Sequence, residues 1–492
     1  MDGAGSLRGR VSTRAWAMGA AAATALLVAV VVVQILRSGS DPGATAVTRY
    51  LPDVDADYLP KAYAAAAVLA AVLVVGVFVR RLAVGTRRAL PWAVGALSAI
   101  AALSPWWAVH SGAAGMAQSL YRALHVPQGI IPFWDLTLVL QSVDCAADGY
   151  DVFAPDNGCL ADAAIYGPGV LWLRFVPLGA FSAAAHAEWL GVAAVLLSSL
   201  LLVWLARASM GTGQVVLLVA AVGGPWQLLL ERGNIDAVVL WGAAAAVILV
   251  RRWDRLWAWS LAAAIIWLLG TWKYYPFAMG LMLIPALRLR RGWTVLAGYL
   301  VAAGLFVAVT WSNFAFSAES NSGMVDYREV GAMGRIVVVA RMIGSVVNPT
   351  NLQPGDLLVY AVALAAAAWG AAVALATKRS LRHPAMLAIA GSSMLLASVL
   401  LSGFGWGYKA TFLLLGVPLV AALVGSRRVV IASSAITVLA LIAIVSVVSW
   451  NTVLATIAAT VAGAFCFGAA GAYLVRSVLP ARTAQRAATS MT

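Results

Sequence analysis

The chain has 492 residues, of which 63% are hydrophobic and only 11% are charged, and its mean hydropathy is +0.90. Soluble domains carry about 25% charged residues, so this composition excludes an ordinary soluble globular protein. Apolar runs of about 20 residues predict transmembrane helices, and their unbroken character excludes the alternating pattern of a membrane β-barrel. The net charge of +14 comes from short basic clusters between the apolar runs, which is the positive-inside pattern and not a nucleic-acid-binding face. We therefore expect an all-α, polytopic integral membrane protein.

The apolar runs predict about fourteen membrane-spanning helices. The first, from Trp16 to Leu36, follows three arginines and is too long for a signal-peptide core of about 7–15 residues, so we expect a retained signal anchor. The stretch 169–180 is apolar but short, and a full span, a half-span and an interfacial helix all remain open for it. The other expected spans lie near residues 63–79, 91–110, 190–205, 215–230, 237–250, 257–270, 277–287, 293–311, 357–376, 386–401, 411–423, 429–448 and 453–475.

These spans divide the chain into four predicted parts. Residues 1–89 hold the signal anchor and an extra helix pair, and residues 90–425 form the membrane core. Residues 426–476 form a C-terminal helix pair, and residues 477–492 form a basic tail that we expect to be disordered. Large outer loops are expected at residues 111–168 and 312–356.

The basic clusters predict the orientation. With the N-terminus inside and the spans alternating, every strongly basic short cluster falls on the inner face, as the bias of Lys and Arg requires. Both termini are then cytoplasmic, and the unusual polar motifs lie on the outer face. The inner clusters are Arg80–Arg88, Arg207–Gly213, Arg251–Arg255, Arg288–Arg291, Lys378–His383, Arg427–Arg428 and the C-terminal tail.

The longest polar interruption runs from Ile131 to Leu173 and carries six of the 19 acidic residues. Within it, Trp134-Asp135 follows the third span, and a carboxylate held there by aromatic neighbours could take a proton from a hydroxyl group that attacks an activated carbon. Asp135 could equally cap a helix over residues 136–143. Secondary candidates for binding hydroxyl groups are Asp151, Tyr166 and Asp156, although a solvated loop is the better interpretation of Asp156.

Two of the three cysteines, Cys145 and Cys159, lie in this loop, fourteen positions apart. On the oxidising side of a bacterial membrane such a pair usually forms a disulfide, which is worth about 3 kcal/mol on the chain-entropy model. No histidine lies between them, so a metal site would lack ligands. Cys466 lies inside a span and is expected to be a small core residue.

A second motif, Glu231-Arg232-Gly233-Asn234-Ile235-Asp236, opens the span that begins near residue 237. A helix N-terminus gathers unpaired N–H groups and favours an anion, and Arg232 can hold a phosphate through two N–H donors. The alternative is a local pair between Arg232 and Asp236, with Asn234 as the helix cap. Because arginine is disfavoured on the outer face, the sequence favours anion binding.

Two further motifs place a lysine among aromatic residues. They are Trp272-Lys273-Tyr274-Tyr275-Pro276 and Gly405-Trp406-Gly407-Tyr408-Lys409. Either lysine could bind phosphate at the membrane surface. Either could also be a snorkelling lysine in an aromatic belt, and this interpretation is stronger for Lys409.

Several sequence patterns are absent. The chain has no GxxxxGK[ST], GxSxG, HExxH or CxxC pattern, and its four histidines have no metal-ligand spacing. ATP hydrolysis, serine hydrolysis and zinc chemistry therefore have no visible site. The sequence predicts no metal site and no cofactor, and it leaves a requirement for a divalent cation open.

Taken together, these motifs resemble those of the GT-C superfamily of polyprenyl-phosphate-sugar-dependent glycosyltransferases, and especially bacterial glycosyltransferase family 87, the α-mannosyltransferase group. The resemblance is carried by the Asp135 segment with its Tyr166-Gly167-Pro168 exit, the Arg232–Asn234 motif, the Lys273-x-Tyr275-Pro276 motif and Gly407–Leu415. It covers roughly residues 92–423. It implies an inverting sugar transfer on the outer face, with an acidic residue of the first large outer loop as base. Here that loop follows the third span and not the first, which implies two added N-terminal helices, and it is enlarged and carries the cysteine pair.

The sequence thus predicts a GT-C-like membrane glycosyltransferase that moves mannose or arabinofuranose from a polyprenyl-phosphate donor to an envelope glycolipid or glycan. Asp135 would be the base, and Arg232, Lys273 and Lys409 would bind the donor phosphate. The alternatives are a transporter or flippase for a lipid-linked precursor, and a polysaccharide polymerase or ligase that uses a lipid-diphosphate donor. The expected location is the bacterial plasma membrane. Residues expected to contact substrate are Trp134, Asp151, Tyr166, Glu231, Asn234, Asp236, Tyr274, Tyr275 and Tyr408.

Overall fold

The structure is a computed structural model, and it describes residues 84–123, 126, 132–154, 157–160, 166–175, 183–209, 211–314, 354–377, 381–402, 407–424 and 452–489. Within these ranges every regular element is a helix and there is no strand, as the sequence predicted. The predicted spans at residues 16–36, 63–79 and 429–448 lie outside the described residues. So do Asp156 and most of the second outer loop.

The first half of the described chain alternates long and short helices. Its elements are α4 (Val84–His110), α5 (Ala114–Ala123), α6 (Trp134–Ala147), the 3-10 helices η2 (Pro168–Phe175) and η3 (Ala183–His186), α7 (Ala187–Ala208), α8 (Thr212–Ala220), α9 (Gly224–Glu231) and α10 (Asp236–Arg252). The second half contains α11 (Leu256–Trp272), the 3-10 helix η4 (Tyr275–Arg288), α12 (Gly292–Val309), α15 (Pro354–Leu375), α16 (Arg382–Ser402), the 3-10 helix η7 (Gly407–Gly416), α17 (Val417–Val424) and α19 (Thr452–Thr489).

Four of the described helices are long and apolar enough to cross a membrane, and a bent pair makes a possible fifth. These lengths and compositions indicate a multi-pass membrane protein. The bent pair corrects the single span predicted near residues 215–230, since α8 and α9 meet at an angle of 51°. The break falls at residues 221–223, and Pro225 follows it in the first turn of α9. Proline fits that position because the N–H groups in the first turn of a helix have no partner within the helix, so no hydrogen bond is lost.

One predicted span takes an unexpected form. The segment predicted near residues 277–287 is the 3-10 helix η4, which has 14 residues and an internal proline, Pro285. A 3-10 helix rises about 2 Å per residue, so η4 is about 28 Å long, close to the thickness of a bilayer's hydrocarbon core of about 30 Å. The tighter winding therefore gives a short segment almost the length of a span.

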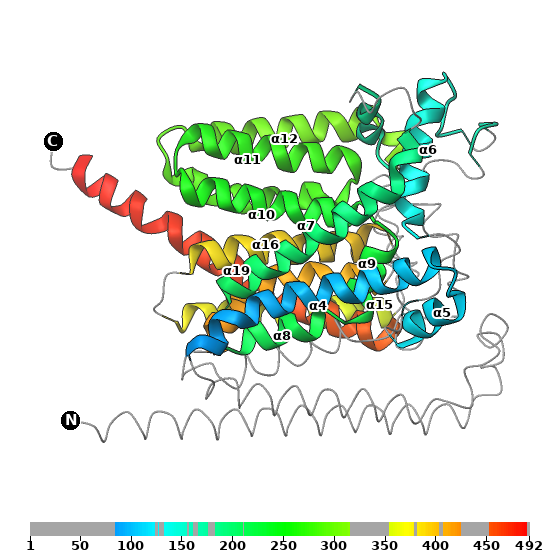
Figure 1. Ribbon diagram of the computed structural model, residues 1–492. Coiled ribbons are helices and arrows are strands. Elements are labelled where there is room, and N and C mark those ends of the chain that lie inside the picture. Colours follow the sequence, from blue (N-terminus) through cyan, green and yellow to red (C-terminus); the bar gives the residue numbers. More distant parts are fainter. Residues whose placement is uncertain are drawn as a thin grey trace.

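The described helices form a bundle with α5 and α6 at one end and the C-terminus of α19 at the other (Figure 1). Helix α10 links two different polar regions, since it begins at Asp236 and ends at Arg252. Just beyond its end, the carboxylate of Asp254 contacts Arg288 from the end of η4 and Arg382 from the start of α16. Three of the basic clusters therefore meet at one end of α10, and Asp236 lies at the other end, about 25 Å away.

Helices also occur in two segments outside the predicted spans. The segment predicted as an outer loop at residues 111–168 contains the two helices α5 and α6. The tail predicted to be disordered is part of α19, which runs to Thr489. The residues after Pro480 are mostly alanine, arginine and glutamine, which are strong helix formers, so the helix continues where charge and small size suggested disorder.

Helix α9 lies inside the bundle, and all eight of its residues are buried. The indole ring of Trp226 in α9 is fully buried, and its Nε1 donates to the hydroxyl of Ser98 in α4 at 2.8 Å. A fully enclosed helix resists displacement, because interiors pack as densely as organic crystals. The C-terminus of α9 carries Glu231 and Arg232, so the second sequence motif begins on a rigid support.

Candidate functional site

The N-terminus of α6 rests on the C-terminus of α9. The backbone N–H of Phe133 donates to the carbonyl of Glu231 at 2.7 Å, and that of Asp135 donates to the carbonyl of Arg232 at 3.0 Å. The first N–H groups and the last carbonyls of a helix have no partner within their own helix. Here N–H groups at the start of α6 donate to carbonyls at the end of α9, and these hydrogen bonds hold Asp135 beside Arg232.

The turn that allows this approach depends on glycine. Gly233 has a φ of +59°, a region that side chains with a Cβ disfavour, and a Cβ there would lie 3.0 Å from the Cβ of Leu136 and 3.2 Å from that of Phe133. Phe133 also has a left-handed backbone, with a φ of 59°, and its ring leaves no room for a side chain at Gly191. Gly233 and Phe133 together define the angle between α6 and α9.

The carboxylate of Asp135 is buried, at 8% exposure, and accepts from two side chains. The Nε of Arg232 donates to Oδ1 at 2.8 Å, and the Nδ2 of Asn234 donates to Oδ2 at 2.5 Å. Helix α6 has no side-chain cap, and Asp135 lies in its first turn. The capping interpretation of Asp135 is therefore wrong, because its oxygens face the α9–α10 turn and not the backbone of its own helix.

A second carboxylate, Asp236, gathers two lysines from distant parts of the chain. The Nζ of Lys273 lies 2.7 Å from Oδ1, and the Nζ of Lys409 lies 2.7 Å from Oδ2. The hydroxyl of Tyr275 also donates to Oδ1. Asp236 is completely buried, so the two ammonium groups are held to it in a region from which water is largely excluded.

Asn234 joins the two carboxylates into one network. Its Nδ2 donates to Asp135, while its Oδ1 accepts from the Nζ of Lys273 and from the backbone N–H of Asp236, both at 3.0 Å. The bond to the Asp236 N–H closes a turn just before α10, whose N-cap is Ile235 and has no side-chain cap bond, so the prediction that Asn234 caps the helix is wrong. The sequence also allowed a local pair between Arg232 and Asp236. In the structure Arg232 pairs with Asp135 instead, and Asp236 pairs with Lys273 and Lys409.

Tyr166 covers one side of this network. The Nζ of Lys273 lies 5.1 Å from the centre of the Tyr166 ring, within the range of a cation–π contact. Burial raises the pKa of the Tyr166 phenol well above its ordinary value, and the nearby carboxylates of Asp135 and Asp236 act in the same direction. Tyr166 therefore keeps its proton and can donate a hydrogen bond.

The Tyr166-Gly167-Pro168-Gly169 turn is pressed against the end of α11. The N–H of Gly167 donates to the carbonyl of Trp272 at 2.8 Å. A Cβ at Gly167 would lie 2.3 Å from the carbonyl oxygen of Thr271, and a Cβ at Gly169 would lie 2.1 Å from its Oγ1. Thr271 is not among the site residues predicted from the sequence, although the paired glycines of the turn are the signal for such close backbone packing.

The other predicted substrate contacts are placed less centrally. Tyr274 points to α12, where its hydroxyl donates to the carbonyl of Thr310 at 3.4 Å. Asp151 is exposed and accepts from the N–H of Phe153 at 3.2 Å, as in a solvated turn. Trp134 is half-buried next to Asp135 in the chain, and Glu231 is buried at the end of α9. Tyr408 is the second residue of η7, and its side chain lies outside what the structure describes.

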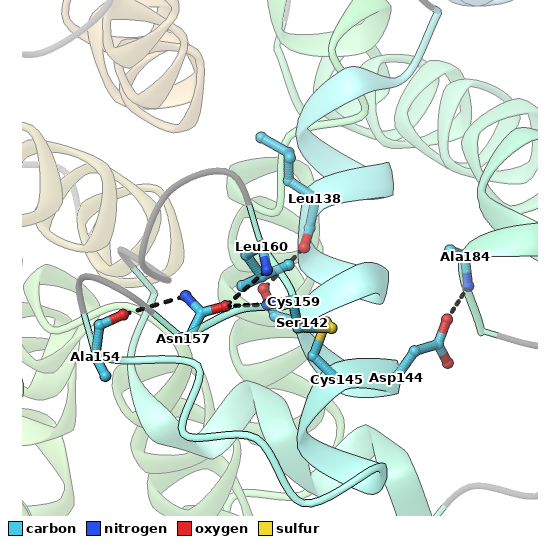
Figure 2. Close-up of a disulfide and its surroundings, with 9 residues drawn as sticks. All are labelled: Leu138, Ser142, Asp144, Cys145, Ala154, Asn157, Cys159, Leu160 and Ala184. Atoms are coloured by element: carbon cyan, nitrogen blue, oxygen red, sulfur yellow. Dashed lines mark hydrogen bonds between the residues drawn. A yellow bond between two sulfur atoms is a disulfide. The ribbon is translucent and has the colours of Figure 1, made fainter.

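The predicted disulfide is present at the far end of α6. Cys145 and Cys159 are bonded, with their Cα atoms 6.0 Å apart (Figure 2). Asn157 shapes the loop that leads to Cys159, because its Oδ1 accepts from the N–H of Cys159 at 2.9 Å. On the same helix, Asp144 accepts from the N–H groups of Ala183 at 2.7 Å and Ala184 at 3.0 Å. The loop and η3 are thus both tied to α6.

The network has the composition of an anion site. Arg232, Lys273 and Lys409 bring three positive charges to the carboxylates of Asp135 and Asp236, and they come from three separate segments of the chain. Among the described residues no group of three or more His, Cys, Asp or Glu side chains could hold a metal ion. Comparisons with protein families, with curated proteins and with solved structures find no match.

Proposed function

We propose that this protein is a membrane glycosyltransferase of the GT-C type, which moves a sugar from a polyprenyl-phosphate donor to an envelope glycolipid or glycan. The observation that carries the proposal is the joining of Asp135, Arg232, Asn234, Asp236, Lys273 and Lys409 in one buried network. A carboxylate beside a cluster of cationic side chains is what acid–base chemistry next to a phosphate leaving group requires.

In the proposed reaction, the oxygen of an acceptor hydroxyl attacks the anomeric carbon of the donor sugar, with inversion. The bond from that carbon to the phosphate oxygen breaks, and Asp135 takes the proton of the hydroxyl. Each carboxylate oxygen has two lone pairs, so Asp135 can accept from the hydroxyl while it keeps Arg232 and Asn234. The released polyprenyl phosphate carries one more negative charge than the donor did.

Because charge develops on the leaving phosphate, cations that are already in place stabilise the transition state more than the bound donor. Lys273 and Lys409 have side-chain exposures of 12% and 11%, so their charges are poorly screened by water. Arg232 holds Asp135 and belongs to the same network. The proposed roles are therefore a base on α6 and a phosphate site where α10, α11 and η7 meet.

The proposed topology follows from the two ends of α10. The basic residues around Asp254 are assigned to the cytoplasm, and the Asp135 network to the outer face of a bacterial plasma membrane. About fourteen spans with both termini cytoplasmic fit this assignment. Mannose and arabinofuranose are the proposed sugars.

The test is sugar transfer by the purified full chain in lipid nanodiscs. Polyprenyl-phosphate mannose and arabinofuranose, each labelled in the sugar, are supplied with envelope glycolipid extract, and polyprenyl-diphosphate sugars are supplied in parallel. Labelled glycolipid from a monophosphate donor is the expected result. Transfer from the diphosphate donor alone would favour a polymerase or ligase. Movement of a lipid-linked sugar across proteoliposomes without any transfer would favour a flippase.

A further inference from the structure

Asp236 is the most enclosed carboxylate of the network, with none of its surface exposed. Both of its oxygens are already engaged, Oδ1 by Lys273 and Tyr275 and Oδ2 by Lys409. A sugar or phosphate group would have to displace a lysine to reach it. The substrate-contacting role expected for Asp236 therefore does not suit its position.

The same position suits a different role. Lys273 follows the last turn of α11, and Lys409 lies near the start of η7, so the two lysines have no local reason to be adjacent. Two buried ammonium groups repel each other strongly where the dielectric is low. A carboxylate between them, at 2.7 Å from each, offsets this repulsion and fixes where each Nζ lies.

The charge within this trio is not balanced. With both lysines protonated, two ammonium groups face one carboxylate within the trio, in a region with little water. Among the described residues, Lys273 donates to Asn234 and Asp236 and so uses two of its three N–H groups. A bound anion would supply both the missing charge and an acceptor for the third N–H group.

We propose that Asp236 is a positioning residue, which holds Lys273 and Lys409 as a preformed pair for one phosphate anion and does not itself touch substrate. The inference rests on the proposed function, which supplies that phosphate as part of the lipid donor. Preformed donors do not have to reorganise as charge develops on the leaving group, and this is the main source of electrostatic catalysis.

The positioning role and simple charge repulsion predict opposite changes in the affinity for the anion when Asp236 is replaced. If Asp236 only repelled the incoming anion, Asp236→Asn would bind it more tightly. If Asp236 holds the lysines in place, the same substitution releases them and weakens binding. Loss of one well-placed charge-assisted contact corresponds to a change of about tenfold or more in the dissociation constant.

The experiment measures binding of a short-chain polyprenyl phosphate to the purified full chain in nanodiscs. The variants are Asp236→Asn, Lys409→Met and the double variant, and Asp148→Asn is the control because Asp148 is exposed beyond the end of α6. Thermal melting of each variant is recorded. We expect about tenfold weaker binding for both single variants and unchanged binding for Asp148→Asn.

The double variant removes one positive and one negative charge, so it separates positioning from folding. We expect it to melt closer to wild type than Asp236→Asn does, and yet to bind as weakly as Lys409→Met. Wild-type binding by Asp236→Asn or by the double variant would overturn the positioning role and leave the proposed function standing. A wild-type protein that binds no polyprenyl phosphate would overturn both.

Discussion

The Nε of Arg232 donates to Oδ1 of Asp135 at 2.8 Å, although the two residues are 97 positions apart in the chain. The contact exists because the carbonyl of Arg232 also accepts from the backbone N–H of Asp135, so backbone and side chain join the same two residues. Each of these residues was selected from the sequence for a separate reason. Their pairing makes the proposed base and one proposed phosphate-binding residue parts of a single unit.

The first prediction concerns this pair. In Arg232→Lys the charge remains, but lysine has no group that corresponds to Nε, so the geometry of the contact to Asp135 is lost. We expect sugar transfer to fall by about 10- to 100-fold, the effect of losing a charge-assisted hydrogen bond of about 1.5–3 kcal/mol. Initial rates at saturating donor check this. Transfer at the wild-type rate would show that charge alone suffices at residue 232.

The second prediction concerns the turn beside Lys273. In Gly169→Ala the new Cβ would lie 2.1 Å from Oγ1 of Thr271, so the turn must move away from α11. Overpacking of this kind costs about 1–3 kcal/mol. Thermal melting in detergent should therefore show a lower midpoint for Gly169→Ala. Gly298→Ala is the matched control, because a Cβ at Gly298 meets nothing within 4 Å and alanine favours its helix.

The third prediction concerns the disulfide. Replacement of both cysteines by serine should destabilise the folded protein by about 3 kcal/mol, on the chain-entropy model, because the loop closed by the Cys145–Cys159 bond is released. The Asp135 network is held by α9 and α10, not by this loop, so transfer at low temperature should persist. Melting curves and transfer assays of the Cys145→Ser/Cys159→Ser double variant check both statements. Complete loss of transfer at a temperature where that variant stays folded would mean that the loop itself contributes to the site.

The fourth prediction concerns orientation. Ser111 follows α4 and Arg291 precedes α12, and both are exposed. If the Asp135 network faces outward, a membrane-impermeant thiol reagent should label Ser111→Cys in intact cells. It should label Arg291→Cys only after the cells are permeabilised. The reverse pattern would place the network in the cytoplasm and remove polyprenyl-phosphate sugars on the outer face as donors.

The sequence predicted the helical class and most members of the polar network, because charge is costly in a membrane. Arg232, Lys273 and Lys409 were selected since each conflicted with the expected bias of positive charge toward the inner face. The same reasoning could not predict their partners. Whether Asp236 pairs with Arg232 four residues earlier or with two distant lysines depends on how the helices pack, which no local pattern encodes.

The elements that the sequence misjudged were those decided by backbone geometry. Helix α5 was not predicted because it lies in a segment that was interpreted as a polar loop. The bend between α8 and α9 was not predicted because both helices are apolar. A count of apolar residues cannot distinguish a straight span from a bent pair, although Gly223-Gly224-Pro225 marks the place of the break. Tyr274 and Tyr275 are adjacent and chemically alike, and only the winding of η4 sends one to Thr310 and the other to Asp236.

The most direct test of the central claim is the rate of sugar transfer by Asp135→Asn, measured beside wild type and Asp148→Asn with labelled polyprenyl-phosphate sugar. The asparagine preserves the size of the side chain but cannot accept a proton. If Asp135 is the base, its variant should lose transfer by about 10²- to 10⁴-fold, while it still binds polyprenyl phosphate and melts near wild type. Asp148→Asn should transfer normally. Wild-type transfer by a folded Asp135→Asn protein would contradict the account.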